Sequence, residues 1–245
     1  MSINEYPISL QETLTTNLGA VRTRIAEAAG RVGRTPEEIT LVAVSKTRSL
    51  EMIKMAYDLG VTDFGENRVQ EALHKVSEFR PQDIRWHMIG HVQTNKAGKV
   101  AGSFDCIQSV DSLHLAEIVN RHAQQLDIHQ PILLQVNISG EESKEGMAAG
   151  EVVSLARQIV TLPHVEVRGL MTIAPLVQDA ERVRPVFRAL RLLRDRLRAE
   201  IAGDFWHHLS MGMTDDYHIA IEEGATIVRI GRAIFGERVK KGDPQ

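Results

Sequence analysis

Lys46 is the residue of this sequence whose type and position most directly suggest chemistry. It ends the segment "VAVSK", residues 42–46, in which apolar residues recur as they do in a buried β-strand. Lysine is rarely buried without a partner, so either the chain leaves the core here and the ammonium reaches water, or the amine has a function. A lysine amine in such a position can condense with an aldehyde.

Two later segments have the composition of phosphate-binding loops. In "SMGMTDD", residues 210–216, Gly212 allows the backbone to approach a ligand closely, and Ser210 and Thr214 supply hydroxyl groups. In "RIGRAI", residues 229–234, Gly231 stands in the same way between a strand and a helix. Free amides and the positive end of the helix dipole at such joints favour phosphate. Thr214 is also a normal helix-capping residue, and the two roles do not exclude each other.

Arg229 adds a positive charge to the same region. Val228 and Ile230 share one face of the last predicted strand, so Arg229 lies on the other face. If the apolar face packs on helices, the guanidinium points inward, where it needs an acceptor or an anion. A lysine amine, a phosphate site and an arginine together suit pyridoxal phosphate (PLP). Because an aldolase for phosphorylated sugars also uses a barrel lysine, the residues alone leave both open.

The elements that must position these residues alternate regularly along the chain. Eight short apolar runs, each followed by a helical pattern or a short tail, begin at "ITLVAVSK", "VTDFGEN", "IRWHMIG", "FDCIQSV", "PILLQVNIS", "VEVRGLMTIA", "FWHHLSMG" and "TIVRIG". Eight strand–helix units close a parallel sheet into a barrel, whereas a doubly wound sheet has fewer strands and a glycine fingerprint after the first. Chemistry in barrels gathers at the carboxyl ends of the strands, where Lys46, Arg229 and both loops then meet.

We expect residues 1–245 to form a single (β/α)8 TIM barrel domain with an extra N-terminal helix. Leu14, Leu18, Val21 and Ile25 recur at helical spacing, and residues 1–36 are predicted to hold this helix and the linker to the first strand. A length of 245 residues is typical of such a barrel.

Composition excludes several classes of protein. A net charge of -3 gives no general attraction to nucleic acid or to anionic membranes. No run of eighteen apolar residues predicts a membrane helix, and the N-terminus lacks a signal-peptide pattern. The single cysteine, Cys106, cannot form an internal disulfide and is predicted to be a small strand residue, which fits a reducing cytoplasm.

The remaining polar candidates are weaker. Asn67 follows the second predicted strand, where it could contact the cofactor ring or cap the next helix, and the sequence leaves both open. His87 and His91 are four residues apart, but the strand pattern denies them a shared helical face, so we expect no metal site. One of His207 and His208 should face the barrel, and packing is the simpler role for it. The sequence assigns none of these histidines a function.

Six segments carry a family resemblance across nearly the whole chain: "LVAVSKTRS", "DFGENRVQE", "WHMIGHVQTNK", "VNISGEESKEG", "GLMTIAP" and "LSMGMTDDYHIAIEEGATIVRIGRAIFG". They resemble the pyridoxal phosphate homeostasis family, also called the YggS or proline synthetase co-transcribed family. The resemblance implies a barrel of the alanine-racemase N-terminal-domain type, with Lys46 forming a Schiff base with PLP. It also implies phosphate contacts from the loop 210–214, from Gly231 and from Arg232, with Arg229 beside the pyridine nitrogen.

The chain departs from the family pattern at three positions. Met88 and Val92 stand where the family more often has Phe and Leu, and Arg232 replaces a common Thr. The last change preserves a backbone contact to phosphate but removes a side-chain hydroxyl.

The resemblance implies a cytoplasmic, monomeric protein without catalytic residues, which holds PLP on Lys46, controls its free level and delivers it to PLP-dependent apoenzymes. A PLP-dependent amino-acid racemase is the alternative. We expect the carrier, because the chain ends at Gln245, soon after the last predicted strand, without the second domain that alanine racemases append. An arginine at the ring nitrogen also leaves that nitrogen unprotonated, which weakens the ring as an electron sink.

Overall fold

Eight parallel strands close into a barrel in the computed structural model, which describes residues 8–141 and 144–237. The strand order is β4-β3-β2-β1-β9-β8-β7-β5, and a pairing of β4 with β5 closes the ring. The barrel strands are β1 Thr40–Val44, β2 Asp63–Glu66, β3 Arg85–Met88, β4 Cys106–Val110, β5 Gln130–Asn137, β7 Val165–Met171, β8 His208–Ser210 and β9 Ile227–Ile230. The predicted fold class is therefore confirmed. A further strand that the sequence did not predict, β6 Met147–Ala148, pairs with the end of β5.

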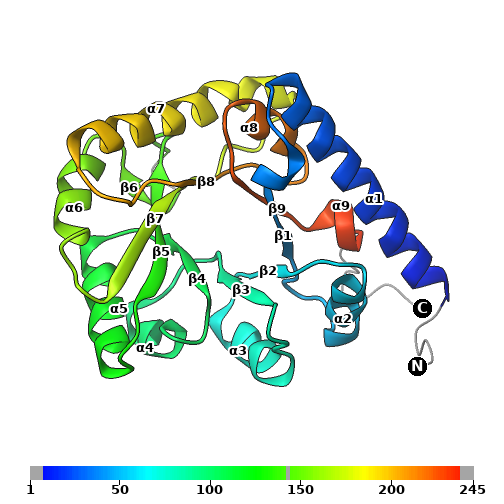
Figure 1. The fold of residues 1–245 in the computed structure, drawn as a ribbon, viewed down its shortest axis with the longest axis horizontal. Coiled ribbons are helices and arrows are strands. Elements are labelled where there is room, and N and C mark those ends of the chain that lie inside the picture. The colour runs from blue at the N-terminus through cyan, green and yellow to red at the C-terminus, as the bar shows by residue number, and fades with distance from the viewer. Residues whose placement is uncertain (1–7, 142–143, 238–245) are drawn as a thin grey trace.

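Helices surround the strands (Figure 1). The α-helices are α1 Ile8–Arg31, α2 Leu50–Asp58, α3 Val69–Glu78, α4 Ala97–Val100, α5 Leu113–Gln125, α6 Val152–Ile159, α7 Arg184–Glu200, α8 Tyr217–Glu222 and α9 Arg232–Phe235. Three 3-10 turns, Pro36–Glu38, Thr94–Lys96 and Ala180–Val183, precede β1, α4 and α7. Each predicted strand is thus followed by a helix, and the tail expected after the last strand contains α9.

The N-terminal helix α1 covers a part of the barrel that the last helix, α9, is too short to cover. Since α9 has only four residues, α1 packs beside it and beside α8 (Figure 1). The predicted apolar stripe of α1 is buried in this contact. The Asn17 side chain donates to the carbonyl of Ile234 at 3.0 Å, and Arg31 forms an ion pair with Glu222 at 2.7 Å.

Strand alternation divides the core into two parts. Outward residues such as Ala43 and Phe64 pack against the helices, while a separate cluster lies inside the barrel, formed by Val42, Cys106, Leu133, Met171 and Ile227. Burial raises the pKa of the Cys106 thiol to about 12, so it acts as a packing residue, as predicted. Arg229 lies two residues after Ile227 and continues the inward face of β9 toward the C-terminal mouth, where Lys46 lies in the turn that follows β1.

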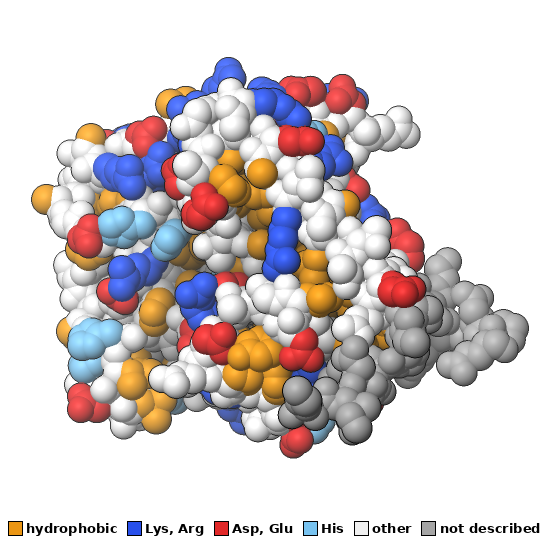
Figure 2. All heavy atoms as spheres, turned by 45° about the vertical axis from the view of Figure 1, so that its right-hand side comes forward, with side chains coloured by type: hydrophobic (Ala, Val, Ile, Leu, Met, Phe, Trp, Pro, Cys, Tyr) orange, Lys and Arg blue, Asp and Glu red, His pale blue; other side chains and the backbone are white. Residues whose placement is uncertain are grey.

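Acidic and basic side chains are interspersed over the face in Figure 2, in keeping with the small net charge of -3. Among residues 8–141 and 144–237, no helix has the length and apolar composition needed to cross a membrane.

Candidate functional site

The backbone around Lys46 is fixed from both sides. The carbonyl of Ser45 accepts from Lys75 Nζ at 2.8 Å, and the amide of Thr47 donates to Glu71 Oε1 at 2.6 Å. Thr47 has a φ of 64°, a left-handed conformation that costs about 1–3 kcal/mol in a residue other than glycine. It persists because both neighbours of Lys46 are tied to α3. The lysine therefore leaves β1 on a turn of fixed geometry.

A buried ion pair lies behind this turn. Lys75 Nζ contacts Glu66 Oε1 at 2.7 Å, and the hydroxyl of Ser45 donates to the same oxygen at 2.7 Å. Burial raises the pKa of the Glu66 carboxyl, and the Lys75 ammonium only partly offsets this. The sequence analysis missed this pair. The available signal was a lysine on the buried face of α3, between Ala72 and Val76.

Arg229 lies inside the barrel, as its strand position predicted. Its side chain is buried, with the residue only 3% exposed; Nη1 donates to Ser210 Oγ at 2.6 Å and Nη2 to the carbonyl of Thr172 at 2.8 Å. Burial lowers the pKa of Arg229 to about 10, and Asp216 partly opposes this shift. The guanidinium therefore remains a cation at neutral pH, held by two uncharged oxygens.

Ser210 begins a chain of buried side chains that crosses the barrel interior, here called the interior chain. Its hydroxyl donates to Gln108 Oε1 at 2.6 Å, and Gln108 Nε2 lies 3.0 Å from His87 Nδ1. His87 Nε2 in turn lies 2.9 Å from Asp63 Oδ1. Because arginine can only donate and a carboxylate can only accept, every bond between Arg229 and Asp63 donates in the same direction. The hydroxyl proton of Ser210 is thus committed to Gln108, not to the predicted phosphate site.

The far end of the interior chain lies at the N-terminal end of the barrel. Asp63 accepts from Arg85 Nε at 2.8 Å and Nη2 at 2.6 Å. Burial raises the pKa of the Asp63 carboxyl, but bonds from His87 and Arg85 outweigh it and hold this pKa well below its usual range.

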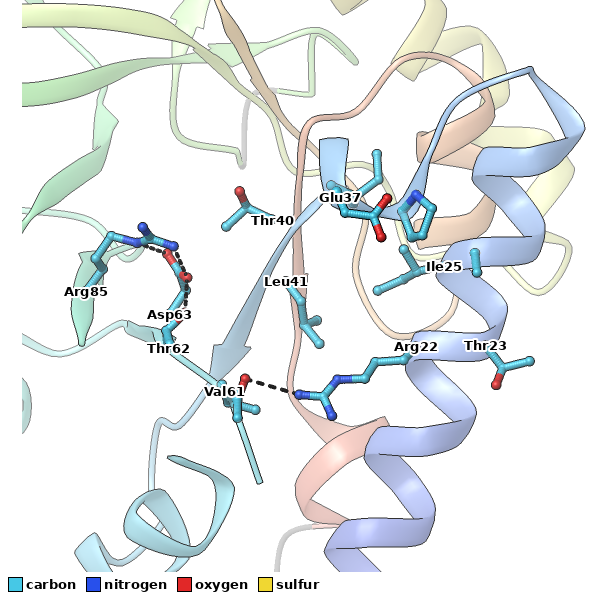
Figure 3. A pocket seen from close by; sticks show the side chains of 14 residues that line it. Arg22, Thr23, Ile25, Glu37, Thr40, Leu41, Val61, Thr62, Asp63 and Arg85 are labelled. Atoms are coloured by element: carbon cyan, nitrogen blue, oxygen red, sulfur yellow. Dashed lines mark hydrogen bonds and ion pairs between the residues drawn. The ribbon is translucent and has the colours of Figure 1, made fainter. Parts of the chain in front are cut away.

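A cavity of about 660 Å³ lies at this N-terminal end, with Arg22 of α1 on one side and the Arg85–Asp63 pair on the other (Figure 3). Arg22 is held there by the carbonyls of Leu59 and Gly60 at 3.0 and 3.1 Å. Barrel chemistry gathers at the opposite end, where Lys46 is, so this cavity is not the candidate cofactor site.

The loop between β8 and α8 needs glycine in order to pack on α8. Gly212 has a φ of 92°, and a Cβ atom there would lie 2.6 Å from Ala220 Cβ and 2.8 Å from Tyr217 Cα. The missing side chain therefore faces α8, and glycine lets the loop pack on this helix. Thr214 Oγ1 lies 3.5 Å from the amide of Ala233, so this loop meets the first turn of α9.

The loop between β9 and α9 also packs tightly. A Cβ atom on Gly231 would lie 3.2 Å from the carbonyl oxygen of Val44, next to the end of β1. The Arg232 guanidinium is paired with Asp215 at 2.5–2.6 Å, which ties the two loops together and leaves its backbone for any phosphate contact. Since α8 has six residues and α9 four, the helix dipoles that the sequence suggested are small.

Asn67 does not act as the helix cap that the sequence left open. The N-cap of α3 is Arg68, and Asn67 Oδ1 is buried without a hydrogen-bond partner among the described residues. Gly90 fixes its position, because a Cβ atom at Gly90 would lie 2.2 Å from the Asn67 carbonyl oxygen. A buried acceptor without a partner favours the other alternative, a contact with a ligand.

The histidines have separate surroundings. His87 belongs to the interior chain, and His91 Nδ1 contacts Asp111 at 3.1 Å. No group of three or more His, Cys, Asp or Glu side chains is placed to hold a metal in the part of the chain that the structure describes. His208 shares the strand face of the interior chain, where burial lowers its pKa, and His207 is partly exposed.

Comparisons with known proteins point to one family of proteins. Residues 16–239 match the family model described as alanine racemase, N-terminal domain. A pyridoxal phosphate homeostasis protein of Aquifex aeolicus is 44% identical over 221 residues, which cover 90% of this chain and 96% of that protein. The solved structure of PipY from Synechococcus elongatus PCC7942, with PLP bound, is similar at a TM-score of 0.80 and 36% identity, covering 91% of this chain and 100% of that one. Alanine racemase of Clostridium difficile 630, in complex with cycloserine, has a TM-score of 0.72 at 16% identity over 94% of this chain and 60% of its own, which shows the fold alone.

Proposed function

Because the chain belongs to the family of pyridoxal phosphate homeostasis proteins, we propose that it binds PLP as a Schiff base on Lys46 and serves in the homeostasis and carriage of PLP. Delivery to PLP-dependent apoenzymes, a cytoplasmic location, a monomeric state and a single domain over residues 1–245 are parts of this proposal. They are supported by the composition and by the family resemblance.

The observation that carries the proposal is the buried cation at the mouth that also holds Lys46. Arg229 is fixed by Ser210 and Thr172 and keeps further N–H groups that can donate to a ring nitrogen. The buried Oδ1 atom of Asn67 adds an acceptor that has no partner among the described residues. When bound, PLP supplies an aldehyde for the amine, a ring nitrogen for the guanidinium and a phosphate for the two loops.

Each residue then has a distinct task. Lys46 offers its amine from a fixed turn, Arg229 donates to the ring nitrogen, and Asn67 contacts the cofactor ring. Gly212, Thr214, Gly231 and the backbone of Arg232 surround the phosphate. Ser210 acts through Arg229, because its hydroxyl accepts from that guanidinium and donates to Gln108.

We propose binding rather than turnover. The A. aeolicus relative is named for homeostasis, and the likeness to alanine racemase, at 16% identity, extends to the fold only. The pKa of Arg229, about 10, is far above that of a pyridine nitrogen, so the guanidinium keeps its proton and the ring stays uncharged. An uncharged ring is a weak electron sink, which opposes racemase chemistry.

Absorption spectroscopy of the purified protein with added PLP tests the proposal. We expect a visible imine band in the wild type and in Lys99→Ala, a matched change of an exposed lysine on α4, and its loss in Lys46→Ala. An equal band in the Lys46→Ala variant would contradict the assignment.

A further inference from the structure

Two of the sequence motifs contain more polar residues than the proposed cofactor site uses. These motifs, "DFGENRVQE" and "WHMIGHVQTNK", include β2 and most of β3, and the residues that follow the two strands meet at the C-terminal mouth of the barrel. Together they line a cavity of about 460 Å³, whose wall includes Asn67, Arg68, Glu71, His91, Gln93 and Lys96. Of these, only Asn67 is also a proposed cofactor contact, so the cavity lies beside the cofactor site and is distinct from it.

The wall of this cavity has an excess of positive charge. Neither Arg68 nor Lys96 forms an ion pair within residues 8–141 and 144–237. The carboxylate of Glu71 is already engaged, because its Oε1 atom accepts from the Thr47 amide at 2.6 Å and from Lys75 Nζ at 2.7 Å.

Among the charged residues of the wall itself, Arg68 and Lys96 are cations and Glu71 is an anion, which leaves one positive charge. Behind the wall, Lys75 pairs with Glu66 at 2.7 Å, and His91 contacts Asp111 at 3.1 Å and Glu145 at 3.7 Å. Cationic side chains in a concave wall that form no ion pair with a described residue attract an anion.

The net positive charge of the cavity wall indicates which kind of anion fits it. One uncompensated positive charge matches a carboxylate, which carries one negative charge, better than a phosphate monoester, which carries about 1.5 to 2. A guanidinium also presents the paired N–H groups that a carboxylate accepts side by side. A small carboxylate therefore fits the cavity better than a second phosphate.

The position of the cavity relates it to Lys46. Glu71 lines the cavity and binds the amide of Thr47, the residue directly after Lys46. Asn67 forms the boundary between the cavity and the cofactor site, and its backbone is held against Gly90. A ligand in the cavity would therefore lie beside a cofactor bound to Lys46, separated from it by Asn67.

We propose that this cavity is a subsite for the carboxylate of a small molecule, held by Arg68 and Lys96 next to the cofactor. Its existence depends only on these residues, whereas its role beside a bound cofactor rests on the proposed function. α-Amino acids and 2-oxo acids both carry the required group.

Titration of the cofactor-free protein with sodium acetate, at constant ionic strength, tests the subsite by backbone amide NMR. We expect saturable shifts confined to residues 67–71 and 91–96, with binding at least tenfold weaker in Arg68→Met and in Lys96→Met. Lys99→Met, the neighbouring exposed lysine on α4, should bind acetate as the wild type does. Arg68 is exposed and Lys96 half-buried, so neither substitution should prevent folding, which the same spectra report.

Three results would overturn the proposal: shifts that do not saturate, shifts that persist unchanged in both variants, or inorganic phosphate shifting the amides of residues 67–71 and 91–96 at lower concentrations than acetate does. L-Alanine and pyruvate, titrated separately, show which class of carboxylate binds better, while ethylamine, which lacks the group, should leave these amides unshifted. The Lys46→Ala variant should bind acetate normally. A failure of PLP binding is therefore distinguishable from a failure of the subsite.

Discussion

Replacing Gln108 with leucine interrupts the interior chain at its centre. Gln108 is fully buried, accepts from the Ser210 hydroxyl at 2.6 Å and pairs with His87 Nδ1 at 3.0 Å. In the variant, the hydroxyl proton of Ser210 and the Nδ1 atom of His87 both lose their partners. The bond between His87 and Asp63 remains, so the change separates Arg229 from the lower half of the chain.

The expected loss of stability follows from these two groups. Each buried polar group left without a partner costs about 1–3 kcal/mol. Burial of the leucine side chain returns about 1.5–3 kcal/mol. We therefore expect the free energy of unfolding to fall by about 0.5–3 kcal/mol. Ser210 still accepts from Arg229 in the variant, but its hydroxyl can rotate, so it holds the guanidinium less firmly. The affinity for PLP should therefore fall about tenfold, near 1.4 kcal/mol.

Urea unfolding measures the first quantity, and titration of the imine band with PLP measures the second. Gln130→Leu is the matched control. Gln130 lies at the N-terminal end of β5 and is similarly buried; its side chain accepts from the Gly102 amide at 2.8 Å and donates to the carbonyls of Phe104 at 3.0 Å and Pro131 at 3.3 Å. It should lose similar stability and keep its affinity. Gln108→Glu retains an acceptor for Ser210 and should recover most of the affinity. Equal affinities in Gln108→Leu and Gln130→Leu would refute the reasoning, because the interior chain would then serve stability alone.

Three further predictions follow from the site. Because the folded-state pKa of Asp63 is lowered, the stability that its carboxylate contributes is present above about pH 4 and is lost as the pH falls through the folded-state pKa. The free energy of unfolding in urea should therefore fall more steeply on acidification for the wild type than for Asp63→Asn. Parallel pH profiles would contradict this. Gly231→Val places a side chain against the Val44 carbonyl, 3.2 Å from the Cβ position, and should reduce the preference for PLP over pyridoxal. In the same titrations, Thr214→Ala should lower the affinity for PLP by about tenfold. Equal binding of PLP and pyridoxal to the wild type would exclude a phosphate site at these loops. The loaded protein should not racemise L-alanine, and α-proton exchange in D₂O at enzymatic rates of about 1 s⁻¹ or more would defeat the carrier function.

The barrel could be predicted from the sequence because its signals are local. The apolar run through Val42 and Val44 ends just before Lys46, which places the lysine at the carboxyl end of β1, and alternation through Ile227 and Arg229 places the guanidinium inside. The strand β6 could not be found in this way. It has only two residues, too few for a pattern, and it exists because it pairs with Val136 and Asn137 of β5.

The interior chain could not be predicted, because its bonds form only when the barrel closes. Ser210 and Gln108 are 102 residues apart, and the pattern of neither strand indicates that the other lies opposite. Ser210 was therefore expected to offer its hydroxyl to phosphate. Similarly, the position of Gly212 between a strand and a helix indicated a need for glycine, but the sequence could not show that a side chain at this position would meet α8.

The most direct test of a cofactor held on Lys46 is borohydride reduction of the PLP-loaded protein, followed by peptide mass spectrometry. We expect one reduced PLP adduct, on the peptide that contains Lys46. An adduct placed on another lysine, such as Lys75 or Lys96, or no adduct at all, would contradict it.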